Sequence, residues 1–218
     1  MNSRQLYQQL IIPPKLQQHM LTVAAVGKYI IDHWQGPFIS EQTIINALLV
    51  HDLGNLVKFD LTKNAQVIDP TLLTDDWRKR QVALRKKYGH SSHQATAKII
   101  QELGLPIQIQ QLVSNLDAAN ICNNANDSLT QQICSYADLR VTPKGVASLT
   151  ERLTDLRERY QAKYSIWKND AFFAQHNQCA QQIEATLQQY TSTDIINIPS
   201  EKIELLLVEL AQFEILTN

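Results

Sequence analysis

Glycine and proline are scarce in this chain, which has six glycines and seven prolines among its 218 residues. Alternation of apolar and polar residues between turn residues, the pattern of a half-buried strand, is also nearly absent. Long stretches instead repeat apolar residues at three- and four-residue steps, which is the pattern of an amphipathic helix. The sequence therefore predicts an all-α fold.

An excess of positive charge is also missing, because 20 Lys and Arg residues stand against 21 Asp and Glu residues. A chain so balanced lacks the basic surface that binds a nucleic acid polymer. No apolar run reaches the roughly 18 to 20 residues of a membrane span, and the N-terminal segment has no apolar signal core. No glycine-rich loop is present to cradle phosphates, which excludes kinase and P-loop chemistry. We therefore expect no membrane partner and no export.

Cysteine is rare as well, and the three cysteines show no CxxC spacing. Cys122, Cys134 and Cys179 form an odd, scattered set, which is typical of reduced thiols. The sequence therefore predicts a cytoplasmic protein with reduced cysteines.

Apolar periodicity and helix-end signals define the predicted helices. They span residues 3–12, 15–34, 41–53, 75–88, 91–103, 128–140, 148–168, 170–190 and 200–216, with one more opening at Pro106. Residues 60–73 look irregular, and the Asn-rich stretch 114–128 is typical of a helix end followed by a loop. Hydrophobic residues make up 44% of the chain, enough to bury a sizeable core. We predict a helical core, residues 1–145, with a C-terminal helical extension, residues 146–218, packed on it.

Four potential metal ligands face inward on three of these predicted helices. His19 falls on the apolar face of its helix, His51 and Asp52 end the inner side of the next, and Asp138 adjoins the apolar stripe of a later one. Burying the carboxylates without a partner would cost several kcal/mol. Two imidazoles and two carboxylates suit one divalent cation such as Mn²⁺, Mg²⁺, Co²⁺, Ni²⁺, Fe²⁺ or Zn²⁺.

The order of these residues resembles that of a known family. The segments LQQHMLTVAAVGKYI, NALLVHDLGNLVKFD and ICSYADLRVTPKG resemble the HD superfamily of metal-dependent phosphohydrolases, whose signature is H…HD…D. The resemblance spans residues 15 to about 145, and it implies an HD-domain helical bundle. It also implies that His19, His51, Asp52 and Asp138 bind the metal.

Members of this family with two metals have further histidines between the doublet and the last aspartate. The segment KKYGHSSHQATAKII resembles the one that carries the first of these, which makes His90 its equivalent and His93 a neighbour one turn on. The following predicted helix has no histidine, and only Asn115 or Asp117 falls near the expected place. We therefore predict a single metal ion.

The resemblance also implies roles around the metal. Asp52 or Asp60 would orient the attacking water, and His90 would bind phosphate or protonate the leaving oxygen. The predicted substrate contacts are Asn55, Lys58, His93, Arg140 and Lys144. For the three cations in this set, the other interpretation is a solvated charge near a helix end.

Three further segments carry patterns that allow more than one interpretation. The run WRKRQVALRKK is either a solvated helix face or a funnel that concentrates an anionic substrate. The segment TERLTDLRERYQAKY alternates acidic and basic residues at helical spacing, which predicts an exposed helix supported by ion pairs. The final EKIELLLVELAQFEIL is apolar on more than one side, so it is buried on the bundle or shared with a partner subunit in a homodimer.

Together these observations predict a phosphohydrolase that cleaves a phosphate ester of a small molecule by metal-activated water, with a nucleotide as the first candidate. A di-iron HD-type oxygenase is the alternative among enzymes, and it needs two filled metal sites. A non-catalytic domain that senses a nucleotide or a metal, and signals through its C-terminal helices, is the alternative from another class.

Overall fold

The computed structural model describes residues 1–62, 69–162 and 164–217. In these ranges the protein is mostly helical, and the only strands are β1 (Val141–Thr142) and β2 (Gly145–Val146), which pair as an antiparallel hairpin. The predicted all-α fold class is therefore confirmed. The α-helices are α1 (Ser3–Gln9), α2 (Pro14–Asp32), α3 (Glu41–Val50), α4 (Asp75–Tyr88), α5 (Ser92–Glu102), α6 (Ile107–Ser114), α7 (Ile121–Asn124), α8 (Leu129–Leu139), α9 (Leu149–Tyr160), α10 (Asp170–Gln189) and α11 (Ser200–Leu210). Four short 3₁₀ helices complete them: η1 (Asn55–Lys58), η2 (Pro70–Leu72), η3 (Ala118–Asn120) and η4 (Ser165–Lys168).

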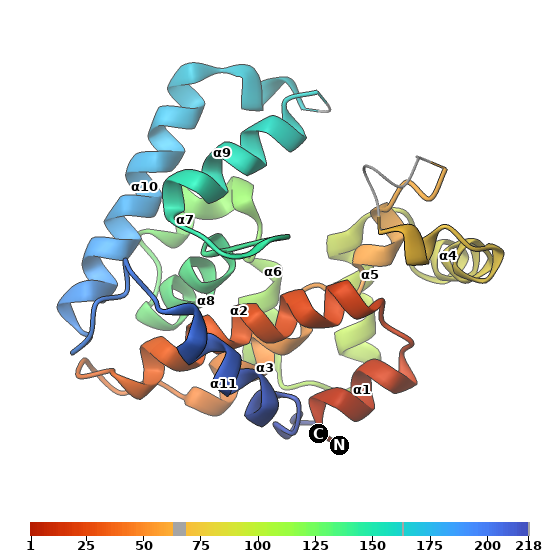
Figure 1. The fold of residues 1–218 in the computed structure, drawn as a ribbon, viewed down its shortest axis with the longest axis horizontal. Helices are drawn as coiled ribbons and strands as arrows, with labels where there is room; N and C mark the ends of the chain where they lie inside the picture. The colour runs from red at the N-terminus through yellow and green to blue at the C-terminus, as the bar shows by residue number, and fades with distance from the viewer. Residues whose placement is uncertain (63–68, 163, 218) are drawn as a thin grey trace.

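Helix α2 is the centre of the molecule, and it packs against α3, α8 and α11 (Figure 1). It begins at Pro14, one residue before the predicted start, and Pro14 in its first turn needs no hydrogen-bond acceptor there. Ser40 and Ser128 cap α3 and α8 by accepting the backbone N–H of Thr43 and Gln131. The three helices that carry the predicted ligands thus begin at residues that the sequence marks plainly.

Several predicted helices are shorter in the structure, and α1 and α3 each end three residues before the predicted end. The stretch 148–168 divides into α9 and η4, with residue 163 outside the described ranges. Helix α11 ends at Leu210, and the chain then bends so that Ile215 N–H donates to the Met1 carbonyl. Of the stretch predicted as irregular, 60–73, residues 63–68 lie outside the described ranges and 70–72 form η2.

The helices after residue 145 share the hydrophobic core with those before it. Leu153 of α9, Ile183 of α10 and Ile203 of α11 are buried in the same apolar cluster as α2 and α3. The two termini lie side by side, and Asn2 and Glu214 form a β-bridge (Figure 1). On the outer side of α11, Leu205 and Val208 remain exposed. The predicted division at residue 145 and the predicted homodimer through the C-terminal helices stay predictions.

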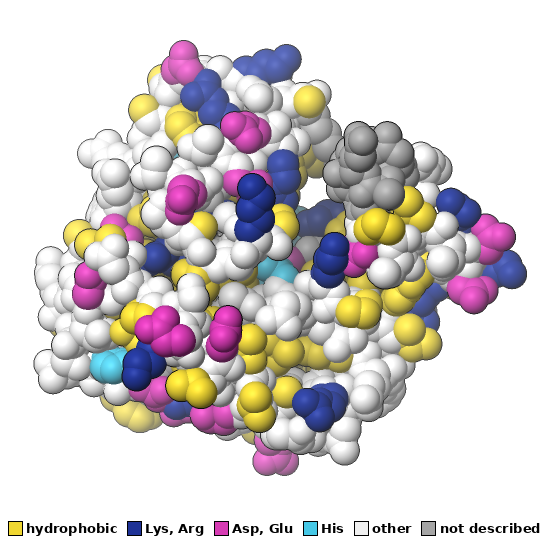
Figure 2. Space-filling model, in the orientation of Figure 1, with side chains coloured by type: hydrophobic (Ala, Val, Ile, Leu, Met, Phe, Trp, Pro, Cys, Tyr) yellow, Lys and Arg dark blue, Asp and Glu magenta, His cyan; other side chains and the backbone are white. Residues whose placement is uncertain are grey.

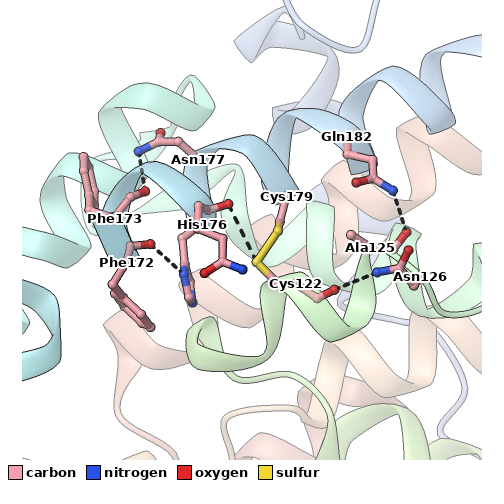
Figure 3. Close-up of a disulfide and its surroundings, with 10 residues drawn as sticks. Cys122, Ala125, Asn126, Phe172, Phe173, His176, Asn177, Cys179 and Gln182 are labelled. Atoms are coloured by element: carbon pink, nitrogen blue, oxygen red, sulfur yellow. Dashed lines mark hydrogen bonds between the residues drawn. A yellow bond between two sulfur atoms is a disulfide. The ribbon is translucent and has the colours of Figure 1, made fainter. Parts of the chain in front are cut away.

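The cysteines correct one prediction from the sequence. Cys122 of α7 and Cys179 of α10 form a disulfide across 57 residues, with their Cα atoms 5.0 Å apart (Figure 3). Only Cys134, which is buried, is a free thiol. Two cysteines so distant in sequence meet because α7 packs against α10, and spacing along the chain does not reveal such a contact. The expectation of three reduced thiols is therefore wrong, and the argument for the cytoplasm that depended on it is lost.

Among the described residues, every helix is too short or too polar to cross a bilayer.

Candidate metal centre

The four predicted ligands converge at one place in the bundle. His19 lies in the first half of α2, His51 ends α3 as its C-cap with Asp52 directly after it, and Asp138 lies in the last turn of α8. Because α2 packs against both other helices, residues that are 119 positions apart along the chain become neighbours. His19, His51 and Asp138 each offer one ligand atom within 4.8 Å of the others, so this group could hold a metal ion.

Asp52 closes this group into a ring of alternating imidazoles and carboxylates. The Nε2 atom of His19 lies 3.6 Å from Asp52 Oδ2 and 3.6 Å from Asp138 Oδ1. The Nε2 atom of His51 lies 3.7 Å and 3.6 Å from the same two oxygens. Two ligands of one octahedral ion, each at about 2.1 Å, lie about 3.0 Å apart when they are adjacent. The four nitrogen–oxygen distances are longer than this by about 0.6 to 0.7 Å, so the side chains would have to move inward for all four atoms to meet one cation.

The tautomer of His51 is fixed by a backbone contact. Its Nδ1 lies 2.7 Å from the Leu48 carbonyl oxygen, which only accepts, so the hydrogen is on Nδ1. In the neutral ring Nε2 then carries a lone pair, and this atom is buried without a hydrogen-bond partner among the described residues. A buried acceptor with its other nitrogen held by a carbonyl is the usual arrangement of a metal-binding histidine. The residues present therefore fit a divalent cation.

The electrostatics of the metal-free cluster support the same conclusion. Burial disfavours the imidazolium of His51, but the charges of Asp52 and Asp138 outweigh it and raise the pKa of His51 to about 9. Burial also opposes ionisation of Asp138, yet His19 and His51 hold its pKa well below the usual value. The pKa of Asp52 is lowered against burial by His51, Lys58 and His19. The two carboxylates thus favour positive charge at the centre of the ring.

An arginine outside the predicted set of site residues also lies at the cluster. Arg152 of α9 places Nη2 3.9 Å from Asp138 Oδ1, and its side chain is only 9% exposed. The sequence held a signal for this position, because Arg152 lies on the same helix face as the buried Leu149, Leu153 and Leu156. An arginine on an apolar face requires a buried partner. The alternation of acidic and basic residues in this segment favours the interpretation of an exposed helix instead.

The segment after the doublet is held against α5 by a close backbone approach. A Cβ atom on Gly54 would lie 2.5 Å from Thr96 N and 2.8 Å from Ser92 O, so only glycine fits without displacing α5. The Gly54 N–H also donates to Thr96 Oγ1 over 3.0 Å. Asn55 is buried beside this contact, and the exposed Lys58 ends η1 close enough to affect Asp52. These two predicted substrate contacts lie next to the cluster.

Three other predicted residues lie outside the ring of four ligands. Asp60 is exposed, and its carboxylate accepts hydrogen bonds from the backbone N–H and the hydroxyl of Thr62. His90 is exposed before the N-terminus of α5. His93 is also exposed, and its Nε2 lies 3.2 Å from Asp117 Oδ2. The catalytic roles of Asp60 and His90 and the substrate contact of His93 stay predictions.

The structure moves Arg140 away from the predicted phosphate contacts. Arg140 is buried, and its guanidinium donates to the carbonyl oxygens of Ala147, Ile195 and Ile196 and to the Tyr136 hydroxyl. Four of its five N–H groups are thereby used inside the protein, so we assign it to the joining of the C-terminal helices to α8. The other predicted cation, Lys144, is exposed in the turn between β1 and β2, and its role stays a prediction.

The space beside the cluster has two parts. A small recess next to Asp138, lined by residues such as Ile121, Asn124 and Ser135, has a volume of about 10 Å³, which is room for one water molecule. On the face shown in Figure 2, a larger hollow opens between the α9 side of the molecule and the α4–α5 side. Lys and Arg side chains border this hollow, and a histidine is visible at its floor (Figure 2). A substrate larger than water would have to lie in the open hollow.

Comparison of the chain with protein families, with curated proteins and with solved structures gives no match.

Proposed function

We propose that this protein is a metal-dependent phosphohydrolase of the HD type that cleaves a phosphate ester of a small molecule. The observation that carries the proposal is the ring of His19, His51, Asp52 and Asp138, in which a buried imidazole nitrogen points at two carboxylates. A bound divalent cation would polarise a phosphoryl oxygen and acidify a water molecule at neutral pH. The resemblance of the three sequence segments to the HD signature supports the choice of reaction.

Each residue of the site has a defined role in this proposal. His19, His51, Asp52 and Asp138 hold the cation, and the Leu48 carbonyl keeps the His51 lone pair directed at it. Asp52 is also the carboxylate that would orient the attacking water. Lys58, beside Asp52, neutralises charge that develops on the phosphoryl oxygens. His90 would supply the proton to the leaving oxygen, as the resemblance implies.

The two alternatives differ from this proposal in what the site must contain. A di-iron oxygenase needs a second metal, and among the described residues only one group of three or more ligands comes together. A sensing domain needs the same metal site but no turnover. We place hydrolysis first because the Arg152 side chain lies 3.9 Å from Asp138 and the charge of Lys58 lowers the pKa of Asp52, so both cations are placed to meet a phosphate group.

Metal analysis combined with a substrate panel tests the proposal. The purified protein is expected to bind one divalent ion per chain and to release phosphate from at least one nucleotide or other phosphate ester with Mn²⁺, Mg²⁺, Co²⁺, Ni²⁺ or Zn²⁺. His51→Ala and Asp52→Asn are each expected to lose the ion while the protein keeps its helical content. No hydrolysis of any phosphomonoester, diester or nucleotide with any of these ions would refute the proposal.

The chain offers a matched control for the histidine variant. His33 ends α2 as His51 ends α3, and its Nδ1 likewise lies 2.8 Å from a backbone carbonyl oxygen, that of Tyr29. His33→Ala removes the same helix-end contact away from the cluster. It is expected to keep the metal and the activity, so a loss of metal in both variants would assign the effect to the helix ends instead.

A further inference from the structure

Arg152 is a buried cation beside the cluster that the binding of a metal ion does not require. Its guanidinium lies 3.9 Å from Asp138 Oδ1 and 3.2 Å from Asp155 Oδ2, with the side chain almost fully buried. Its Nε is buried without a hydrogen-bond partner among the described residues. A positive charge beside Asp138 repels a divalent ion on the same carboxylate. A site selected for metal affinity alone would therefore do better without it.

The charges of the site indicate which kind of ligand would neutralise the positive charge of Arg152. The two carboxylates, Asp52 and Asp138, balance one divalent cation, and the histidines that bind it are neutral. Arg152 and Lys58 each add a positive charge near one of these carboxylates, and Asp155 shares its negative charge between Arg152 and Arg159. A phosphate monoester dianion balances both charges, whereas a phosphodiester carries only one negative charge. The planar guanidinium also matches two phosphate oxygens at once.

We propose that Arg152 binds the phosphate of the substrate, and that the site takes a terminal, dianionic phosphate group rather than a diester. This inference rests on the proposed function for the identity of the substrate. It gives α9, in the C-terminal extension, a direct part in the site. Asp155 lies about one turn after Arg152 on α9. It is a positioning residue, because its carboxylate binds the guanidinium of Arg152.

The proposal is tested by phosphate binding, measured apart from turnover. Protein loaded with Mg²⁺ is titrated with inorganic phosphate and, separately, with dimethyl phosphate, and the heat of binding gives each affinity. The wild type is expected to bind inorganic phosphate at least about tenfold more tightly than dimethyl phosphate. Arg152→Met is expected to lose about tenfold or more of the affinity for phosphate, while its affinity for Mg²⁺ in the absence of phosphate stays equal or rises.

A matched control lies about two turns further along the same helix. Arg159 contacts the same Asp155 carboxylate, but its side chain is 42% exposed and does not contact the cluster. Arg159→Met therefore removes an arginine from Asp155 while leaving Arg152 in place. Its affinity for phosphate is expected to stay within about twofold of the wild type. An equal loss in both arginine variants would overturn the proposal.

Further variants keep the test decisive if Arg152→Met does not fold. Arg152→Lys keeps the charge without the planar fork, and Asp155→Asn removes the group that directs the guanidinium. Each is expected to weaken phosphate binding several-fold. Unchanged phosphate affinity in these folded variants would overturn the proposal. A loss of Mg²⁺ affinity alone would do the same, because it would show that Arg152 only orients Asp138.

The outcome separates this inference from the proposed function. If phosphate binding depends on Arg152 but the protein hydrolyses no ester, the phosphate site at Arg152 is supported and the proposed hydrolase function is refuted. If the protein hydrolyses an ester and Arg152→Met binds phosphate as tightly as the wild type, the hydrolase function is supported and the phosphate site at Arg152 is refuted.

Discussion

His33 and His51 show how one contact separates two otherwise similar histidines. Both end a helix, and both place Nδ1 near a backbone carbonyl oxygen. Only His51 buries its Nε2 between two carboxylates, which raise its pKa to about 9. In the metal-free protein His51 is therefore an imidazolium at neutral pH, and its proton occupies the place of a metal ion.

This pKa predicts how metal affinity depends on pH. Below about pH 9 an incoming cation must displace the proton from His51, so affinity should rise with pH and level off above that value. The affinity for the metal should rise by at most about tenfold per pH unit, and up to one proton should be released for each ion bound. The carboxylates add no slope there, since their pKa values are lowered. Calorimetric titration with Mn²⁺ in buffers of different ionisation enthalpy measures both quantities, and an affinity indifferent to pH between neutral and pH 9 would contradict the prediction.

At the scale of the elements, the position of the doublet depends on how η1 meets α5. Asp52 is followed within two residues by Gly54, whose backbone touches that of α5. Helix α5 thereby fixes where the carboxylate of Asp52 stands relative to α2 and α8. The sequence shows the glycine, but it does not show what the glycine contacts.

Gly54→Ala is expected to destabilise the protein by about 1 to 3 kcal/mol, because the new methyl group overpacks against a backbone that cannot rotate away. It should also weaken metal binding by displacing Asp52. Chemical denaturation and metal titration measure the two effects. Gly89→Ala is the comparison, since Gly89 has a φ of +90° and no atom near its Cβ position. That variant should carry only backbone strain and keep the wild-type metal affinity.

At the scale of the whole molecule, contacts distant in sequence hold the C-terminal helices in place. The guanidinium of Arg140 binds the carbonyl oxygens of Ile195 and Ile196, and the disulfide joins α7 to α10. Helix α9 carries Arg152 and belongs to the stretch of chain that both connections enclose. It also packs against α10. The shape of the site therefore depends on residues far outside the resemblance to the HD signature.

Loss of the disulfide is expected to lower the free energy of unfolding by about 2 to 4 kcal/mol, because opening a loop of 57 residues frees the unfolded chain. The double variant Cys122→Ser/Cys179→Ser and the reduced wild type should show the same lower melting temperature. A reductant should not affect the double variant any further. An equal melting temperature for reduced and oxidised wild type would show that the bond contributes nothing to stability.

The sequence by itself predicted most of the helices, and it selected the three residues, His19, His51 and Asp138, that come together as a possible metal site. Helix ends follow from local chemistry, such as Pro14 in the first turn of α2 and the side-chain caps of Ser40 and Ser128. The inward position of His51 follows from the period of the apolar residues around it, which is a property of one helix. Such features need only neighbours within a turn or two, so they can be read without a fold.

Only the tertiary structure decided which arginine lies at the cluster. Arg140 is two positions after Asp138, and residues two apart on a helix point to opposite sides. Proximity in sequence therefore selected an arginine whose side chain binds carbonyl oxygens away from the cluster. Arg152 arrives 14 positions after Asp138, because the β1–β2 hairpin turns the chain back and α9 packs on β1 and α8. The pairing of Cys122 with Cys179 has the same origin, since contacts between packed helices depend on how the chain turns and leave no local pattern in the sequence.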